Sequence, residues 1–249
     1  VVLVCLKTTS NHLLPTLLPP VLEQATAVVL LQNGLGNEAL AAPLVADRPL
    51  LGGLCFLCSN KVGPGHVRHL DYGRVTLAQH GATGITGTVE AVGADFAATG
   101  VPVVLEADLE LARWKKLVWN VPFNPLSVLL DALPQELLAD ARTRALILDV
   151  MGEVQAGAVA CGHPIGDDFL APNVADTEAM TPYRTSMKVD YDAGRPLEVE
   201  FLLEAPARAA RRAGVTLPRV EALAAAVAFL DSRLDSRLDS RLDSRRPDA

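Results

Sequence analysis

The sequence predicts an α/β protein in which a mainly parallel sheet is followed by an all-helical domain. Over residues 1–107, short apolar runs rich in Val and Leu alternate with helical patterns, as is typical of a parallel sheet covered on both faces. Over residues 108–229 the pattern is almost entirely helical and rich in Ala, Leu, Glu and Arg. Residues 230–249 form a separate low-complexity tail.

The expected elements of the first part alternate along the chain. Each expected strand is a short apolar run, and these runs occupy residues 1–6, 27–32, 49–58 and 101–106. Helices are expected at residues 11–24, 37–45 and 87–100, the first of them bounded by prolines. Residues 66–80 predict a hairpin, because two alternating runs flank Asp71-Tyr72-Gly73.

The two ends of the sequence have unusual patterns. The first ten residues, VVLVCLKTTS, begin directly as a buried strand without an initiator Met, so we expect the original N-terminus to be missing. From Leu230 the tail repeats LDSR four times, which sets like charges at i,i+4 and no Asp–Arg pair at i+3 or i+4. A frayed helix or disorder is expected there, with an oligomerisation strip as the alternative.

Composition excludes several classes of partner. Half of the residues are hydrophobic and the net charge is −7, which argues against nucleic acid or an anionic membrane surface. No apolar run reaches the roughly 18–20 residues of a membrane span, and no signal peptide is visible. We therefore expect a cytoplasmic protein that binds a small molecule and needs a local positive site for any anionic ligand.

The cysteines predict buried structural thiols rather than a metal site. Cys55 and Cys58 form a CxxC, but they lie in an apolar run, and neither a second CxxC nor a His cluster completes a zinc set. Cys5 and Cys161 are isolated in the sequence. Zinc and redox functions stay open as the weaker interpretations, and a reducing compartment is expected.

A polar line runs through the apolar segment RWKKLVWNVPFNPLSVLL, residues 113–130. Lys116, Asn120 and Asn124 recur four residues apart, so on a helix they share one face, drifting by about 40° per step. A surface stripe on an amphipathic helix and a functional cleft are both compatible with this spacing. Pro122 and Pro125 each remove an N–H, and a broken helix is expected at this place.

The chemistry of these three residues indicates a type of ligand. A lysine in a partly apolar cleft is expected to have a lowered pKa and so to release a proton near neutral pH. The amides of Asn120 and Asn124 can hold carboxylate, carbonyl or hydroxyl oxygens without adding charge. The combination suits a small anionic keto or hydroxy acid.

Two further segments carry candidate polar residues. Lys7 and Asn33 follow directly on predicted strands, and ligands of open α/β sheets bind beyond the carboxyl ends of the strands. An Asn-Gly pair after a strand is otherwise a common turn. The segment 183–201 carries polar residues between aliphatic ones: Ser186, Asp190, Arg195, Glu198 and Glu200. A solvated helix–loop–helix without a function would show the same pattern.

Together these segments resemble the ketopantoate reductase (2-dehydropantoate 2-reductase) family. Its motifs appear in order as LKT (6–8), QNGLGN (32–37), KLVWNVPFNP (116–125) and SMKVDYDAGRPLE (186–198). The resemblance covers residues 1–228. It implies a partial Rossmann-type dinucleotide-binding domain before a helical substrate-binding domain, and reduction of 2-dehydropantoate to pantoate by NADPH, a step of pantothenate and coenzyme A biosynthesis.

The resemblance also implies a role for each matching residue. Lys116 would be the general acid that protonates the ketone oxygen, and Glu198 would orient the substrate or cofactor and tune the lysine. The remaining positions would bind the substrate (Asn120, Asn124 and Ser186) or contact the cofactor near its nicotinamide half (Lys7 and Asn33). An exposed apolar face of the helical domain would favour a homodimer.

The sequence departs from the family pattern at several points. The family begins with G-x-G-x-x-G, whereas GATGITG (81–87) has neither that spacing nor a strand–helix context. We expect two βα units to be missing, on the order of 60 residues at roughly 30 per unit. Val189, Glu200 and Ala205 stand where Gln, Asp and Gly are usual.

Two alternative functions follow. The first is a β-hydroxyacid dehydrogenase of the 6-phosphogluconate dehydrogenase kind, although the residues before Lys116, LEADLELARWK, contain no glycine of the expected stretch. The second is a non-catalytic remnant that acts as an interaction module through its LDSR tail.

Overall fold

The computed structural model describes the backbone of residues 1–243 and the side chains as far as Leu234. The chain divides into two compact units. Unit 1 contains Val1–Leu117 and His163–Ile165, and unit 2 contains Val118–Gly162 and the residues from Gly166 onward. None of the helices over the described residues is both long and apolar enough to cross a membrane.

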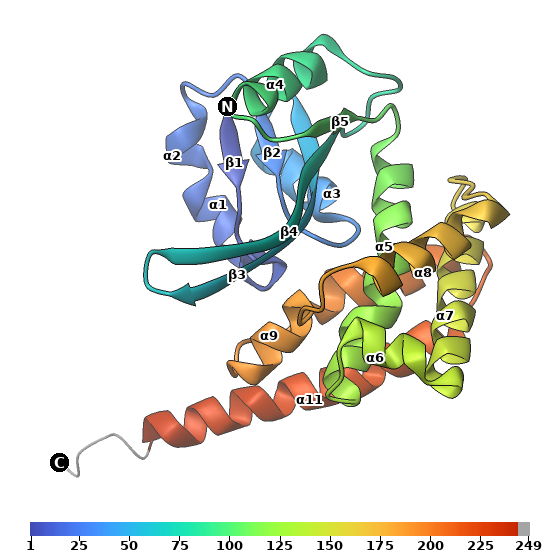
Figure 1. Ribbon diagram of the computed structural model, residues 1–249. Helices are drawn as coiled ribbons and strands as arrows, with labels where there is room; N and C mark the ends of the chain where they lie inside the picture. Colours follow the sequence, from blue (N-terminus) through green and yellow to red (C-terminus); the bar gives the residue numbers. More distant parts are fainter. Residues whose placement is uncertain (244–249) are drawn as a thin grey trace. The chain divides into compact units, whose positions relative to one another are not determined.

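Unit 1 is built on a five-stranded sheet in the order β1-β2-β3-β4-β5 (Figure 1). Three of its pairings are parallel (β1·β2, β2·β3 and β4·β5) and β3·β4 is antiparallel, which confirms the predicted α/β class. The strands are β1 Val2–Val4, β2 Val28–Leu30, β3 Leu50–Gly63, β4 His66–Gln79 and β5 Val103–Leu105.

Alternation along β2 explains why helices cover both faces of this sheet. Val28 and Leu30 face a core shared with the short helices α1 and α2, whereas Val29 faces the core beneath α4. Figure 1 shows α1 and α2 on one side of the sheet and α4 on the other. The helical segments of this unit are η1 Thr8–Leu13, α1 Leu14–Leu17, α2 Pro19–Leu22, α3 Asn37–Ala41, η2 Ala42–Leu44 and α4 Gly87–Ala98, followed by the start of α5 Leu109–Leu129.

The hairpin predicted within residues 66–80 is wrong. The whole segment is the single strand β4, which pairs with β3, and the chain reverses between Gly63 and His66. The register shifts between Phe56 and Leu57, opposite Tyr72, which has φ of 59°. Turn-forming residues in the middle of an alternating run therefore mark a bulge here, since a bulge needs the same unusual backbone angles as a turn.

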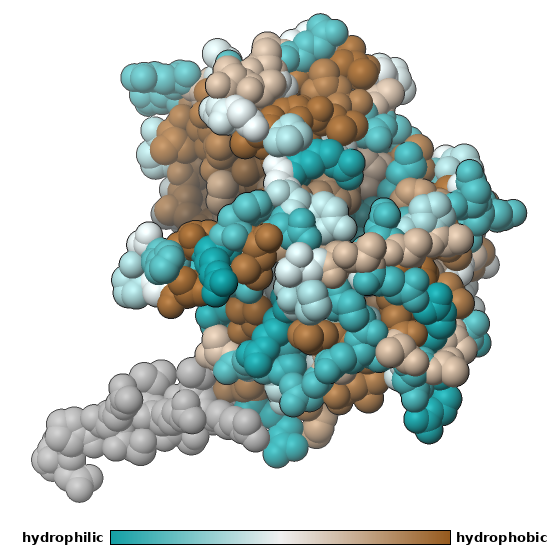
Figure 2. Space-filling view, in the orientation of Figure 1, coloured by the Kyte–Doolittle hydropathy of each residue, from teal (hydrophilic) through white to brown (hydrophobic). Residues whose placement is uncertain are grey.

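An apolar surface lies along β1, the edge strand of the described sheet. Figure 2 shows apolar side chains gathered on this part of unit 1, beside α2. Large exposed apolar residues occur there on β1 and on the helices that follow it: Val1, Leu3, Leu13, Leu17 and Val21. An unpaired strand edge with such side chains favours pairing with a further segment or chain.

Unit 2 is all-helical, as predicted. Side chains cap the first turns of three of its helices. Asp140 accepts from the backbone N–H groups of Arg142 and Thr143 at the start of α7, and Thr185 accepts from the N–H of Lys188 at the start of α9. Glu153 accepts from the N–H groups of Arg219 and Val220 at the start of α11. Its elements are α6 Pro134–Ala139, α7 Ala141–Ala160, η3 Asp167–Phe169, α8 Leu170–Ala179, α9 Ser186–Asp192, η4 Glu200–Glu204 (a π-helical turn), α10 Ala205–Arg212 and α11 Pro218–Asp243.

One expectation about helix continuity is wrong. α5 runs as one helix from Leu109 to Leu129 with Pro122 and Pro125 inside it, so the expected break does not occur. α11 is helical through the LDSR repeats as far as Asp243, which agrees with a helix rather than with disorder there, and fraying of this helix stays a prediction. The remainder of the tail lies outside the described residues.

The close packing of α5 on the sheet gives a first test. A Cβ at Gly52 of β3 would overlap Leu109 Cδ1 and lie 2.8 Å from Glu38 Oε1, and both of these side chains are buried. We expect Gly52→Ala to lower the free energy of unfolding by about 1–3 kcal/mol, because these neighbours have little room to move. Urea denaturation measures the change.

Gly87→Ala is the matched control for this test. A Cβ at Gly87, in the first turn of α4, meets nothing within 4 Å. Its free energy of unfolding should stay the same or rise by about 0.4–1 kcal/mol, because alanine restricts the unfolded chain. Equal effects of the two substitutions would contradict the close packing at Gly52.

Candidate functional site

The carboxyl ends of β1 and β2 bring two predicted residues to one edge of the sheet. Val4 pairs with Leu30 in parallel register, and Lys7 and Asn33 each follow by three residues. Lys7 is exposed and Asn33 is half-buried. This is the edge at which open α/β sheets bind their ligands.

A chain of amide side chains holds the segment that contains Asn33. Gln32 donates from Nε2 to the carbonyl of Leu6 at 3.0 Å and to Asn11 Oδ1 at 2.7 Å. Asn11 Nδ2 donates to Asn37 Oδ1 at 3.0 Å, and Asn37 Nδ2 donates to the carbonyl of Asn33 at 2.8 Å. The network closes the QNGLGN turn on itself and ties it to the end of β1.

The glycines of this turn leave space above it. Gly34 and Gly36 have φ of 96° and 91°, angles that side-chain-bearing residues rarely adopt. A Cβ at Gly36 would meet nothing within 4 Å, so the outer side of the turn is open. A ligand at this edge of the sheet would therefore meet Lys7, Asn33 and the turn backbone.

The first turns of α5 are fixed to the same edge by Arg113. Its guanidinium donates to the carbonyl of Gln32 at 2.5 Å and to that of Leu30 at 3.4 Å, and it forms an ion pair with Glu38 on α3. Both side chains of the pair are only 1% exposed. Burial and the neighbouring Glu38 carboxylate raise the pKa of Glu110, which lies about one turn before Arg113 on the same helix.

Lys116 lies one turn after Arg113 and contacts the next part of β3. Its Nζ donates to the carbonyl of Cys55 at 2.5 Å and lies 4.9 Å from the ring centroid of Phe56. The same ring carries the guanidinium of Arg74 at 4.5 Å. The Lys116 side chain is thus half-buried, with its ammonium held against an aromatic face and a strand carbonyl.

The cysteines near this lysine are thiols. None of the four forms a disulfide, and only Cys58 is buried as expected, whereas Cys55 and Cys161 are half-buried and Cys5 is exposed. Burial raises the pKa of the Cys55 thiol, and the Lys116 ammonium opposes that rise. Among the described residues, no group of three or more His, Cys, Asp or Glu side chains is arranged to hold a metal ion.

The two asparagines of the polar line are buried within unit 2. Asn120 is 6% exposed, and its Nδ2 has no hydrogen-bond partner among the described residues. Asn124 is 2% exposed, and its Oδ1 lies 3.5 Å from the backbone N–H of Met187, which donates to it. The interpretation of these residues as a solvated surface stripe is therefore wrong.

Ser186 is brought next to Asn124 by the contact between α5 and α9. Ser127 donates to the carbonyl of Asn124 at 2.8 Å and shares a 2.6 Å hydrogen bond with Thr185. Thr185 in turn caps α9, of which Ser186 is the first residue. The half-buried Ser186 hydroxyl is thereby carried on a helix start that is fixed to α5.

Glu198 occupies the buried segment that leads into η4. It is 5% exposed, and the N–H of the preceding Leu197 donates to Asp231 of α11 at 2.9 Å. Asp190, also predicted as a polar member of this segment, is buried and accepts from Arg195 at 2.9 Å. Asp192 and Glu200 are exposed, so the expected solvated helix–loop–helix is buried at only two of its four acidic positions.

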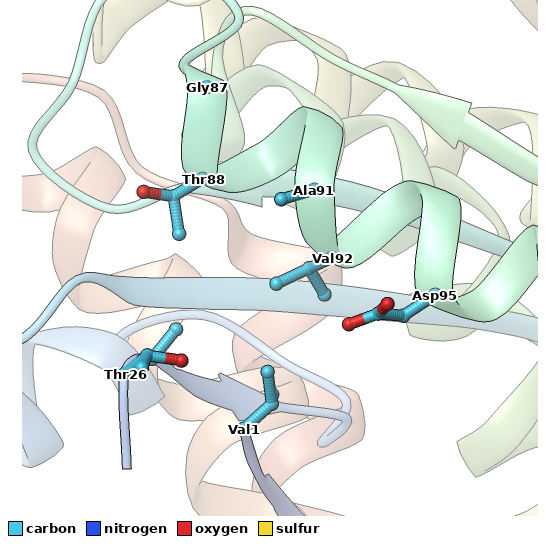
Figure 3. A pocket seen from close by; sticks show the side chains of 8 residues that line it. Val1, Thr26, Gly87, Thr88, Ala91, Val92 and Asp95 are labelled. Atoms are coloured by element: carbon cyan, nitrogen blue, oxygen red, sulfur yellow. The ribbon is translucent and has the colours of Figure 1, made fainter.

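A hollow in unit 1 lies away from these residues. It has a volume of about 290 Å³ and is lined by the start of β1, the residues before β2, and one face of α4 (Figure 3). In Figure 3, Thr26 lies on the β2 side, and Thr88 and Asp95 project from α4. Val1 and Thr26 precede the strands that Lys7 and Asn33 follow, so the hollow is at the opposite edge of the sheet.

Sequence reasoning missed the residues that hold the site in place. Gln32 and Asn37 belong to the quoted QNGLGN motif, and Arg113 opens the quoted RWKKL segment, but none was assigned a role. Asn11 and Glu38 had no signal of their own, because their partners lie 26 and 75 residues away in the sequence.

Comparison with known proteins gives a consistent family. Residues 1–82 match the family described as ketopantoate reductase PanE/ApbA, and residues 108–231 match the ketopantoate reductase PanE/ApbA C-terminal family. A 2-dehydropantoate 2-reductase of Nostoc sp. (strain PCC 7120) is 50% identical over 237 residues, which are 94% of this chain and 74% of that protein.

Solved structures agree with this result. The crystal structure of 2-dehydropantoate 2-reductase from Geobacter metallireducens GS-15 is 40% identical with a TM-score of 0.86, covering 93% of this chain and 76% of that one. D-mandelate dehydrogenase with NADH and anilino(oxo)acetate shares the fold at 20% identity, with a TM-score of 0.81 over 94% of this chain and 78% of that one. The chain therefore belongs to the ketopantoate reductase family.

Proposed function

We propose that the protein reduces 2-dehydropantoate to pantoate with NADPH, with Lys116 as the proton donor. The observation that carries this proposal is the buried Nδ2 of Asn120, which has no hydrogen-bond partner among the described residues and belongs to the helix α5 that also carries Lys116. A buried donor without a partner costs stability unless a ligand satisfies it. The family of the chain and its 50% identical relative support the same substrate.

Lys116 has the chemistry that the reduction requires. When bound, the reduced nicotinamide supplies a hydride to the carbonyl carbon of the keto acid. The ketone oxygen then needs a proton, which Lys116 Nζ can donate, leaving a neutral amine that regains its proton from water. Its Nζ also donates to the carbonyl of Cys55, which orients the ammonium group.

The neutral polar residues of unit 2 suit the anionic part of the substrate. The Nδ2 of Asn120 on α5 and the hydroxyl of Ser186 on α9 are donors for carboxylate or hydroxyl oxygens. Asn124 on α5 provides a second amide. Glu198 is proposed to orient the substrate or cofactor. No second full charge is needed at these positions, because hydrogen bonds from neutral groups to a carboxylate are already strong.

The proposed cofactor contacts are Lys7 and Asn33. Their support is the location of both residues at the carboxyl ends of adjacent parallel strands, beside an open glycine turn. D-mandelate dehydrogenase, which shares the fold, is described with NADH. The reduction rate measured for each combination of NADPH or NADH with 2-dehydropantoate or the keto acid of mandelate therefore tests both the cofactor and the substrate.

Substitution of Lys116 tests the proposed reaction. Lys116→Ala should lower kcat for 2-dehydropantoate reduction by about 10²–10⁴-fold, because the proton donor is lost. The assay follows NADPH oxidation by the product of the complete reading frame that contains residues 1–249. Lys115→Ala is the control, since it removes the adjacent lysine and should leave kcat within a factor of about three. A Lys116→Ala protein that turns over like the control would refute the proposal.

Asn120 allows a second test in which activity and stability separate. Asn120→Ala should raise KM for the keto acid by about 10–100-fold, because a hydrogen bond to a charged group is lost. Its free energy of unfolding should be unchanged or higher, since the unpaired buried donor is removed and alanine favours helix.

Asn124→Ala is the comparison for Asn120. It removes the acceptor of the Met187 N–H at a buried position and should lower the free energy of unfolding by about 1–2 kcal/mol. Steady-state kinetics and urea denaturation on both variants decide the matter. A loss of stability in Asn120→Ala with an unchanged KM would assign Asn120 to packing alone.

A further inference from the structure

The ion pair between Arg113 and Glu38 has no part in the reaction described above, and yet it is deeply buried. Both side chains are 1% exposed, whereas at least one member of every other ion pair among the described side chains is far more accessible. Removing two charges from water is costly, and a buried pair is weak evidence for a gain in stability. The backbone segments that the pair contacts therefore indicate its role better than its own energy does.

The guanidinium holds both ends of the QNGLGN turn. It donates to the carbonyl of Gln32, immediately before Asn33, and pairs with the carboxylate of Glu38, immediately after Asn37. Its further contact with the carbonyl of Leu30 extends this hold into β2. A planar group with several fixed N–H bonds can make these contacts together, which a lysine ammonium of the same charge does less well.

The same residue fixes the register of α5 on β3. Gly52 lies beneath Arg113, since a Cβ there would be 3.1 Å from the guanidinium NH2 and 2.8 Å from Glu38 Oε1. Three residues further along both elements, Lys116 Nζ donates to the carbonyl of Cys55. Arg113 thus connects the turn that bears Asn33 to the helix that bears Lys116.

We propose that Arg113 and Glu38 form a positioning pair that sets Lys116 relative to the QNGLGN turn. This inference rests on the proposed function for its effect on catalysis, but its structural part stands without it. The pair is too buried to touch a substrate, so it acts only through Lys116 and the turn backbone. Removal of the guanidinium fork should loosen the turn and misplace the ammonium while the rest of unit 1 stays folded.

Amide hydrogen exchange of the ligand-free protein tests the structural part. In Arg113→Lys, the amides of residues 33–37 should exchange at least about 10-fold faster, because local opening of a segment with fewer contacts costs less free energy. Val89→Ala is the control, since Val89 is a fully buried residue of α4, which packs on the other face of the sheet. It should lower the thermal midpoint without a selective change in the turn.

Kinetics test the catalytic part. Arg113→Lys should lower kcat by about 10–100-fold, as expected for a misplaced catalytic group, with KM for the keto acid changed by less than about threefold. Val89→Ala should keep kcat at temperatures where it is folded. Arg113→Lys with normal turn exchange and normal kcat would overturn the proposal, whatever its thermal midpoint.

Glu38→Gln and Glu38→Leu provide the second pair of variants, in case Arg113→Lys does not fold. Glutamine keeps an acceptor oxygen for Arg113, so turn exchange and kcat should stay near those of the unchanged protein even if the thermal midpoint falls. Leucine removes the acceptor and should reproduce the effects of Arg113→Lys. Equal behaviour of the two Glu38 variants contradicts the proposal. If Lys116→Ala has normal activity, the proposed function fails, but the exchange measurements still decide whether the pair holds the turn.

Discussion

The continuous helix α5 is the constraint on which the candidate site depends. At about 100° per residue, Arg113, Lys116, Asn120 and Asn124 fall within an arc of about 80° on one face of this helix. Within unit 1 this face carries Arg113 and Lys116, and within unit 2 it carries Asn120 and Asn124. Pro122 and Pro125 remove two N–H groups from the part of the helix in unit 2 but do not interrupt it.

Most of the architecture was predictable because it follows from local patterns. The short apolar runs became strands, and the Ala- and Leu-rich second half became helices, since periodic apolar residues are the main local signal of either element. The failure at residues 66–80 has a clear reason. Tyr72 and Gly73 both adopt positive φ, as turn residues do, but they do so at a bulge within a paired strand. Local sequence cannot distinguish these two uses, because only the partner strand decides between them.

The candidate site was predictable only in part. Lys116, Asn120 and Asn124 were recognisable because a four-residue spacing is unusual within an apolar segment. Arg113 and Glu38 were not, because charged residues are normally solvated and the pairing joins positions 75 apart. Motif reading thus found the groups proposed to do the chemistry, whereas the groups that hold them depend on tertiary contacts that no local pattern records.

Buried polar atoms without a hydrogen-bond partner occur both in a residue proposed to bind the substrate and in the residues that hold the site in place. Among the described residues, five buried side-chain atoms have no hydrogen-bond partner: Gln32 Oε1, Glu38 Oε2, Arg113 Nε, Asn120 Nδ2 and Gln135 Oε1. Four of them belong to the QNGLGN turn, its buried ion pair or the polar face of α5. Each such atom lowers stability, and folded proteins keep few of them. Only Asn120 belongs to a residue proposed to bind the substrate, so the cost in stability falls mainly on the residues that hold the turn and α5 in place, as is common around functional sites.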